Sequence, residues 1–262
     1  MNSFFSALTA EFSKNRHSRI TWITFVGFSL APVMGGVFAI IVRNPEAMAK
    51  VGALRTKADT LNFSPDWNSY FSLLSQAVGV GGVLVFGFVA SWTFGREFSE
   101  GTLKDLLALP VSRKAIIDAK FMTYFLWCIA LSLSNIIVAL LLGNLLALDG
   151  WREVNIVTTL ETYLVTTLLT ILIGIPVALF AMAGEGYMAP LGFVAFTLVF
   201  AQIIAATGFG SYFPWSVPGL YSGAAGEYRG QLNWISYGLL IVVAVTGYVG
   251  SHAWFQRADQ TG

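Results

Sequence analysis

The sequence predicts an all-α integral membrane protein with six transmembrane helices. Hydrophobic residues make up 56% of its 262 residues and charged residues only 11%, whereas a soluble domain carries about 25% charged residues. The mean hydropathy is +0.69, and the apolar residues gather into six runs, each long enough to cross a hydrocarbon core of about 30 Å. A chain of this composition cannot cover itself with a solvated surface, so we expect it in a bilayer.

The whole chain, residues 1–262, is expected to form a single membrane domain. No internal repeat and no polar stretch of domain length interrupts the apolar runs. The net charge of +1 gives no general attraction for nucleic acid. Cys128 is the only cysteine, so an internal disulfide is excluded.

Residues 1–19 are expected to form an amphipathic helix that lies in the membrane interface. Its apolar residues share one helical face, and they are Phe4, Phe5, Leu8 and Phe12. Basic residues gather towards the end of the segment. The alternative is a frayed terminal tail.

The six expected spans are defined by their apolar length. In chain order they cover residues 20–42, 70–94, 121–148, 156–183, 187–207 and 234–255. Pro32 lies inside the first span, where a proline can kink a helix. The second span is rich in glycine, which permits close contact between helices. A very tight turn at residues 184–186 joins the fourth span to the fifth.

The distribution of basic residues sets the expected orientation. If the N-terminus is inside, nine of the 15 Lys and Arg residues lie in cytoplasmic segments and six in outer loops. Cytoplasmic loops carry an excess of Lys and Arg. We therefore expect both termini, and the loop between the second and third spans, in the cytoplasm of a cell whose plasma (inner) membrane holds the protein.

Segment 95–120, between the second and third spans, is the most polar part of the chain. The sequence has 15 basic and 14 acidic residues, and nine of them lie in this segment. Gly101 permits a sharp turn, and Thr102 and Asp105 have the spacing of a capping box at a helix start. Ser112 is a suitable N-cap for a second helix that begins at Arg113.

A short amphipathic helix is expected between these two caps. Its apolar stripe has an i, i+3, i+4, i+7 spacing and consists of Leu103, Leu106, Leu107 and Pro110. Pro110 should end the helix, because it disfavours helical geometry at the preceding residue. Such a helix, joined by a corner to a membrane helix, is suited to transmit force. The alternative is an ordinary interfacial loop with one amphipathic turn.

The residues of this segment resemble the signature between the second and third spans of ABC transporter permeases of the type-2 exporter family. The matching positions are Glu97, Gly101, Thr102, Leu106, Leu107, Pro110, Ser112, Arg113 and Lys120. The wider plan is also similar, with an N-terminal interfacial helix, six spans and a structured outer segment at 208–233. Small six-span permeases of the bacitracin- and lantibiotic-resistance type are the nearest match.

The resemblance implies a division of labour between subunits. Two permease domains, identical or different, would pair around a pathway, and each would dock on a cytoplasmic ATPase subunit. Residues Glu97 to Arg113, Leu103 included, would form the cytoplasmic coupling helix and its flanks, with Glu97 and Arg113 as polar contacts. The chain has no Gly-Lys pair and hence no phosphate-binding loop. ATP and Mg are therefore expected on the partner ATPase, this chain binds no cofactor, and it is not itself an enzyme.

Four polar residues are expected at membrane depth, namely Gln76, Asn135, Glu161 and Gln202. Each either lies along a translocation pathway or, for the three amides, forms a hydrogen bond between helices, and the second interpretation is favoured. Glu161 is either buried, which would be costly, or placed at the interface by a later start of the span. Glu185 in the tight turn is either a second contact with the ATPase or simply solvated.

The outer segment 208–233 is rich in glycine, proline and aromatic residues. It is either a gate over the pathway or an interfacial aromatic belt. The resemblance favours short outer helices that cap the pathway.

The expected function is that of the membrane subunit of an ATP-driven exporter. The alternative is a self-contained secondary transporter or channel, which would call for ionisable groups near the midplane and often for repeated halves. A membrane enzyme is a third class, but the sequence offers no credible catalytic cluster.

Overall fold

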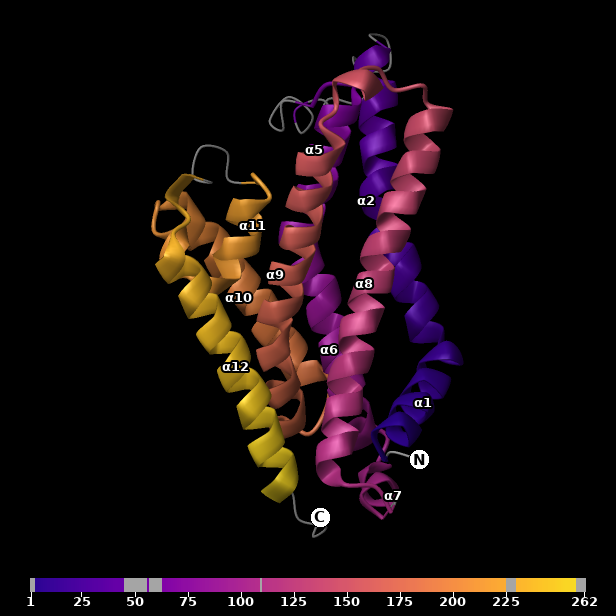
Figure 1. The fold of residues 1–262 in the computed structure, drawn as a ribbon, viewed down its shortest axis with the longest axis vertical. Coiled ribbons are helices and arrows are strands. Elements are labelled where there is room, and N and C mark those ends of the chain that lie inside the picture. Colours follow the sequence, from indigo (N-terminus) through magenta and orange to yellow (C-terminus); the bar gives the residue numbers. More distant parts are fainter. Residues whose placement is uncertain (1–2, 45–55, 57–62, 109, 225–229, 258–262) are drawn as a thin grey trace.

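The computed structural model describes residues 3–44, 56, 63–108, 110–224 and 230–257. Its long helices stand side by side as a bundle (Figure 1). Six of them are long and apolar enough to span a membrane. The all-helical, six-span prediction is thereby confirmed.

The helices follow the predicted order. They are α1 (Ser3–Arg16), α2 (Arg19–Arg43), α5 (Trp67–Gln76), the π-helix η1 (Ala77–Gly81), α6 (Gly82–Ser99), α7 (Leu103–Leu107), α8 (Arg113–Leu145), η2 (Trp151–Glu153), α9 (Ile156–Ala183), α10 (Met188–Ala206), η3 (Gly210–Tyr212), η4 (Pro214–Ser216), α11 (Val217–Tyr221) and α12 (Trp234–Arg257). The second span is made of α5, η1 and α6, which run on without a break. The helix that begins at Arg113 runs on into the third span, as expected, so α8 continues without a break from its N-cap Ser112 into the apolar run.

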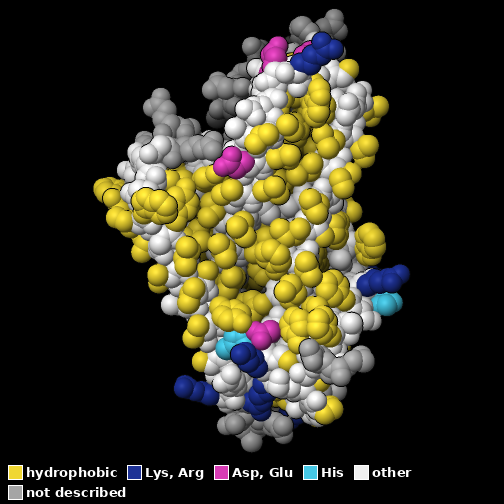
Figure 2. Space-filling view, in the orientation of Figure 1, with side chains coloured by type: hydrophobic (Ala, Val, Ile, Leu, Met, Phe, Trp, Pro, Cys, Tyr) yellow, Lys and Arg dark blue, Asp and Glu magenta, His cyan; other side chains and the backbone are white. Residues whose placement is uncertain are grey.

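Both described chain ends lie at the same end of the bundle as α7 (Figure 1), and we call it the α7 end. The opposite end carries the loop after α8 and, on one side, η3, η4 and α11, and we call it the α11 end. Hydrophobic side chains cover the middle of the face seen in Figure 2, with most charged side chains towards its two ends. This banding is what a bilayer requires.

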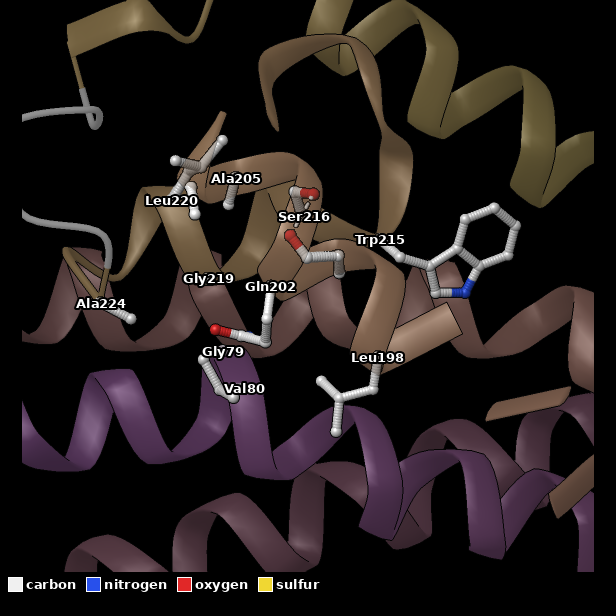
Figure 3. A pocket seen from close by; sticks show the side chains of 12 residues that line it. Gly79, Val80, Leu198, Gln202, Ala205, Trp215, Ser216, Gly219, Leu220 and Ala224 are labelled. Carbon is white, nitrogen blue, oxygen red and sulfur yellow. Dashed lines mark hydrogen bonds between the residues drawn. The ribbon is translucent and has the colours of Figure 1, made fainter. Parts of the chain in front are cut away.

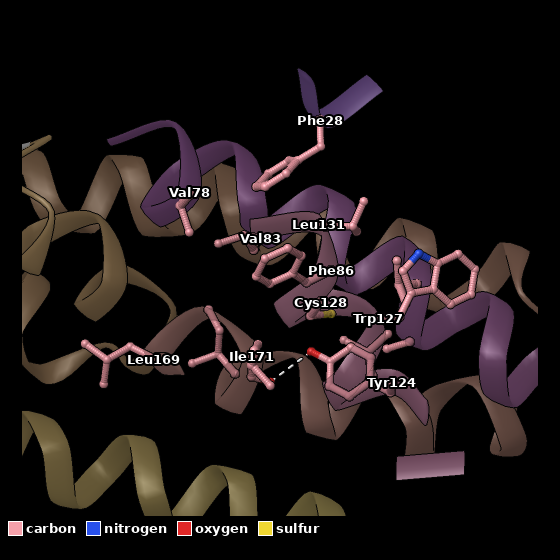
Figure 4. Packing of buried hydrophobic residues seen from close by; sticks show 14 of the residues in the cluster. Phe28, Val78, Val83, Phe86, Tyr124, Trp127, Cys128, Leu131, Leu169 and Ile171 are labelled. Carbon is pink, nitrogen blue, oxygen red and sulfur yellow. Dashed lines mark hydrogen bonds between the residues drawn. The ribbon is translucent and has the colours of Figure 1, made fainter. Parts of the chain in front are cut away.

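The core lies around α9. In the most apolar stretch of each helix, 61% of residues are buried in α9 but only 22% in α10. Figure 4 shows how the cluster is filled from α2, α6, α8 and α9, with Phe28, Phe86 and Leu131 among its members. Glycine permits close contact as predicted, since a Cβ at Gly87 would lie 2.7 Å from the Val194 side chain.

Helix α1 turns part of its apolar face away from the bundle. Its two buried residues are polar, Glu11 and Asn15, while Phe5 and Phe12 are 58% and 43% exposed. The helix therefore packs on the bundle through these polar groups and turns Phe5 and Phe12 outward. Its place in the membrane interface stays a prediction.

Candidate functional site

The polar corner between α6 and α7 is built by a Schellman motif. Gly101 has a φ of +69°, in the left-handed region that favours glycine. The Thr102 N–H donates to the Glu97 carbonyl at 2.9 Å, and the Gly101 N–H donates to the Phe98 carbonyl at 3.3 Å. The expected entry at Gly101 is therefore confirmed.

Helix α7 is short and rests on the bundle through leucines. Leu106 is buried, and Leu103 and Leu107 pack against the core beside it. Pro110 is exposed, and the helix ends at Leu107, before the proline. Lys104 and Asp105 are exposed. The stripe thus attaches α7 to the bundle through its leucines and leaves its charged face open.

The two predicted caps have different outcomes. Ser112 is the N-cap of α8, and its hydroxyl accepts the Ala115 N–H at 3.2 Å, as expected. Thr102 is the N-cap of α7 but makes no side-chain capping bond. The capping-box prediction was wrong, because the Schellman bond holds Thr102 at ψ 5°, away from the extended geometry of a capping residue.

A buried charge cluster lies behind this corner and joins α1, α6 and α8. Its members are Glu11, Lys14, Asn15, Arg96, Glu97 and Lys120. Arg96 donates to Glu11 at 2.7 Å and to Glu97 at 3.1 Å, and Lys120 donates to Glu97 at 2.8 Å. Lys120 also donates to the Thr93 carbonyl at 2.8 Å. Three helices that are distant in sequence are therefore held together by charges.

The charge cluster is withdrawn from solvent. The side chains of Glu11, Arg96, Glu97 and Lys120 are at most 6% exposed, whereas Lys14 is 42% exposed. Buried charges of this kind need partners, because taking an unpaired ion out of water costs several kcal/mol. One carboxylate oxygen, Oε2 of Glu97, has no hydrogen-bond partner among the described residues. A cavity of about 540 Å³ between α1, α6 and α7 adjoins it.

Arg113 extends the connections to α12. Its guanidinium donates to the carbonyl oxygens of Phe255 at 3.2 Å and Gln256 at 2.9 Å. These carbonyls end α12, where an arginine satisfies free acceptors and complements the helix dipole. The first residue of α8 is thus bonded to the last turn of α12.

Glu97 and Arg113 are therefore placed differently from the surface contacts expected of them. Glu97 is 3% exposed, and its Oε1 forms ion pairs with Lys14, Arg96 and Lys120. Arg113 is half-buried against α12. The exposed charged residues of the segment are Glu100, Lys104, Asp105 and Lys114, and two of these, Lys104 and Asp105, lie on α7 itself.

At the α11 end the second span changes its winding. The π-helix η1 replaces one α-helical turn, and π-helical turns inside α-helices are frequent at functional sites. A Cβ at Gly79 would lie 2.6 Å from the Pro218 carbonyl oxygen of α11. Thr170 of α9 donates to the Val78 carbonyl at 3.4 Å. The π-helix is thus in backbone contact with α11 on one side and is bonded to α9 on the other.

A cavity of about 230 Å³ lies between η1, α10 and α11 (Figure 3). It is lined mainly by small and apolar residues, with Gln202 from α10 as its amide. The Ser216 hydroxyl, also on its wall, is bonded to the Ala201 carbonyl at 3.1 Å. The aromatic and proline residues of the outer segment thus form short helices around a cavity.

The other polar residues of the spans have separate places. Asn135 is fully buried and donates to the Phe28 carbonyl at 2.9 Å, which is a bond between α8 and α2. Gln76 bonds to Ser72 on its own helix, and Glu161 is exposed in the second turn of α9. Of the four predicted residues only Gln202 lines the cavity at η1. Among the described residues, no group of His, Cys, Asp and Glu could hold a metal ion.

Sequence reasoning missed the partners of Glu97. Glu11 and Asn15 are one helical turn apart on the polar face of α1, and Arg96 precedes Glu97 at the end of an apolar helix. The sequence did contain a signal for this cluster, because a polar face on the first helix can pair with charged residues at the end of an apolar span. The spacing of the apolar residues in α1 directed attention to the opposite face.

Comparison with known proteins gives two agreeing findings. The model of the ABC-2 family transporter protein matches residues 7–202. The bacitracin transport permease protein BCRB of Bacillus licheniformis is 24% identical over 196 residues, which are 74% of this chain and 90% of that protein. The family match runs from α1 through most of α10 and so includes α7, the charge cluster and the π-helix. The chain belongs to the ABC-2 family of transporter membrane proteins and is a transmembrane permease.

Proposed function

We propose that this permease is the membrane subunit of an ATP-driven exporter in a plasma membrane. Two permease subunits would form the pathway, and separate cytoplasmic ATPase subunits would carry ATP and Mg. The observation that carries the proposal is the α7 corner, which presents a short helix with an open charged face between α6 and α8, two helices that are bonded in turn to α1 and α12. The α7 end would then be cytoplasmic.

The connections at the α7 end give a physical route for the drive. A displacement of α7 would act on α6 through the Schellman turn at Gly101, and on α8 because α8, capped by Ser112, follows α7 closely in the chain. The charge cluster passes the displacement of α6 to α1, and Arg113 passes that of α8 to α12. Four helices would therefore move with α7 as one body.

The α11 end supports the role of an outer gate. The cavity between η1, α10 and α11 lies at the end of the bundle away from α7. Its walls touch through glycine and backbone atoms, so a small separation of α11 from η1 would enlarge it. Gln202 would meet a polar group of the substrate there. The similarity to a bacitracin transport permease favours a peptide-like substrate.

The test is charge reversal on the open face of α7. Lys104→Glu with Asp105→Lys changes two exposed side chains and leaves the leucine contacts in place. We expect the double variant to fold, to lose co-purification with the ATPase subunit, and to lose stimulation of ATP hydrolysis by the permease. The matched control is Arg152→Glu with Glu153→Lys, an exposed pair at the α11 end.

Two results would contradict the proposal. One is unchanged ATPase binding in the α7 variant, and the other is substrate transport by purified permease in vesicles without any ATPase. The second result would favour the self-contained transporter.

A further inference from the structure

A groove of about 520 Å³ lies between α8, α9 and α12, and none of its lining residues belongs to the charge cluster or to the cavity at η1. Its walls are apolar and largely aromatic. They include Phe4, Phe121, Phe125, Leu168 and Tyr248, so four helices contribute. The groove is open on its outer side, where Met122 is 40% exposed and Leu168 is 45% exposed.

The groove exists because two tyrosines space α8 from α9. The Tyr124 hydroxyl donates to the Ile171 carbonyl at 2.9 Å, as Figure 4 shows. The Tyr163 hydroxyl donates to the Ser132 carbonyl, also at 2.9 Å. In each bridge an aromatic ring stands between the helices, so their backbones do not close on each other. Tyr124 and Ile171 form the floor of the groove.

One end of the groove carries a carboxylate. Asp118 lies in the second turn of α8, and its side chain is 27% exposed. The Tyr248 hydroxyl donates to it at 2.7 Å. Nε2 of His252 lies 3.0 Å away but is not aligned as a hydrogen bond. Across the described part of the chain, no Lys or Arg forms an ion pair with Asp118, although Lys114 is one turn away on α8.

We propose that this groove binds an amphiphile that has an ammonium head group and a hydrocarbon tail. The carboxylate of Asp118 supplies the charge for the head group. Phe121 and Tyr248 flank it with aromatic rings, which attract organic cations. The apolar walls take the tail.

The geometry also fixes the direction of the bound molecule. Asp118 lies near the α7 end of its helix, and Phe125 is about 10 Å farther along at 1.5 Å per residue. The head group is therefore near the α7 end and the tail points towards the middle of the bundle. This is the direction of an amphiphile in one leaflet. The site needs no ATPase, so binding can be measured independently of the proposed function.

The experiment uses a dodecyltrimethylammonium probe with a photoreactive group in its tail. Purified full-length permease in a nonionic detergent is titrated with the probe, irradiated, and mapped by peptide mass spectrometry. We expect saturable labelling of the peptide that contains Met122 and Phe125. Asp118→Asn should weaken the apparent affinity about tenfold, since it removes the negative charge that attracts the quaternary ammonium head group. Met122→Trp should abolish labelling by filling the groove.

Matched controls separate the site from general effects. Asp149→Asn removes a carboxylate that is 83% exposed, and Met188→Trp enlarges a methionine that is 73% exposed on α10. The probe should label both of these variants to the same extent as the unmodified protein. Equal affinity for an uncharged dodecyl probe, or labelling that maps to α10, would overturn the proposal. If Asp118→Asn does not fold, the comparison of the two probes and Met122→Trp still decide it.

Discussion

The two ends of the bundle are held by different forces. At the α7 end, five charged side chains and one amide join α1, α6 and α8, and four of those charged side chains are almost fully buried. At the α11 end, η1 meets α11 through close backbone contact at Gly79 and Pro218. The ion pair at that end, Arg43 with Asp149, is largely exposed. The α7 end is thus held by buried charges, whereas η1 and α11 are held together by packing.

This difference has a mechanical meaning. Buried ion pairs are directional and costly to break, so the helices that share them keep their relative positions. Packing contacts lose about a quarter to a half of their attraction when a gap of about 0.5–1 Å opens. We therefore expect the α7 end to move as a unit and the α11 end to part. A permease that is driven from the α7 end needs this arrangement, with a rigid α7 end and an α11 end that can open.

The largest expected effect is at Glu97. Glu97→Ala leaves two buried cations, Arg96 and Lys120, with Glu11 as their one remaining carboxylate partner. Removal of one partner from a buried ion pair costs about 3–5 kcal/mol. We expect a clear fall in the midpoint of thermal unfolding in detergent. We also expect faster tryptic cleavage at Arg16 and Arg19, because α1 loses part of its attachment.

Lys14→Ala is the control for the charge cluster. Lys14 contacts both Glu11 and Glu97, but its side chain is 42% exposed. Exposed ion pairs contribute about 0–1 kcal/mol, so this variant should unfold close to the parent. Equal losses for the two variants would mean that burial does not distinguish them, and the contrast between the two ends would weaken.

The next effect is at Gly79. Gly79→Ala places a methyl group 2.6 Å from the Pro218 carbonyl oxygen, and the strain of such overpacking is about 1–3 kcal/mol. The expected outcome is separation of α11 from η1, seen as faster hydrogen exchange in 217–221 than in the parent. Gly81→Ala is the matched control on the same π-helix, since a methyl group there meets nothing within 4 Å. If the two variants exchange alike, close packing does not hold this end.

Local chemistry accounts for the parts of the fold that the sequence could predict. The apolar runs have the length of a bilayer, so the spans were found, and the fourth was placed at its observed bounds, Ile156–Ala183. Gly101 and Ser112 were found because a left-handed turn and a helix N-cap each require particular residue types. These features depend on a few neighbouring residues.

The charge cluster depends on contacts between distant residues. Residues 11, 96 and 120 meet only after α1, α6 and α8 have packed, and nothing near Glu97 in sequence identifies Glu11 as a member of the same cluster. The same holds for Asp118, which meets His252 across the bundle. The π-helix in the second span was also not predicted, since its glycines and valines are compatible with an α-helix.

The smallest predicted effect concerns the helix cap at Ser112, and it tests whether neutral hydrogen bonds also stabilise the α7 end. Ser112 caps α8, whereas Thr102 begins α7 without a side-chain bond. Loss of a capping hydroxyl costs about 1 kcal/mol, so Ser112→Ala should lower the free energy of unfolding by about that amount. Thr102→Ala should leave it nearly unchanged, and guanidinium titrations of both variants in detergent would measure the difference. If Thr102→Ala costs as much as Ser112→Ala, the Schellman turn does not replace the capping box, and the corner at Gly101 needs another account.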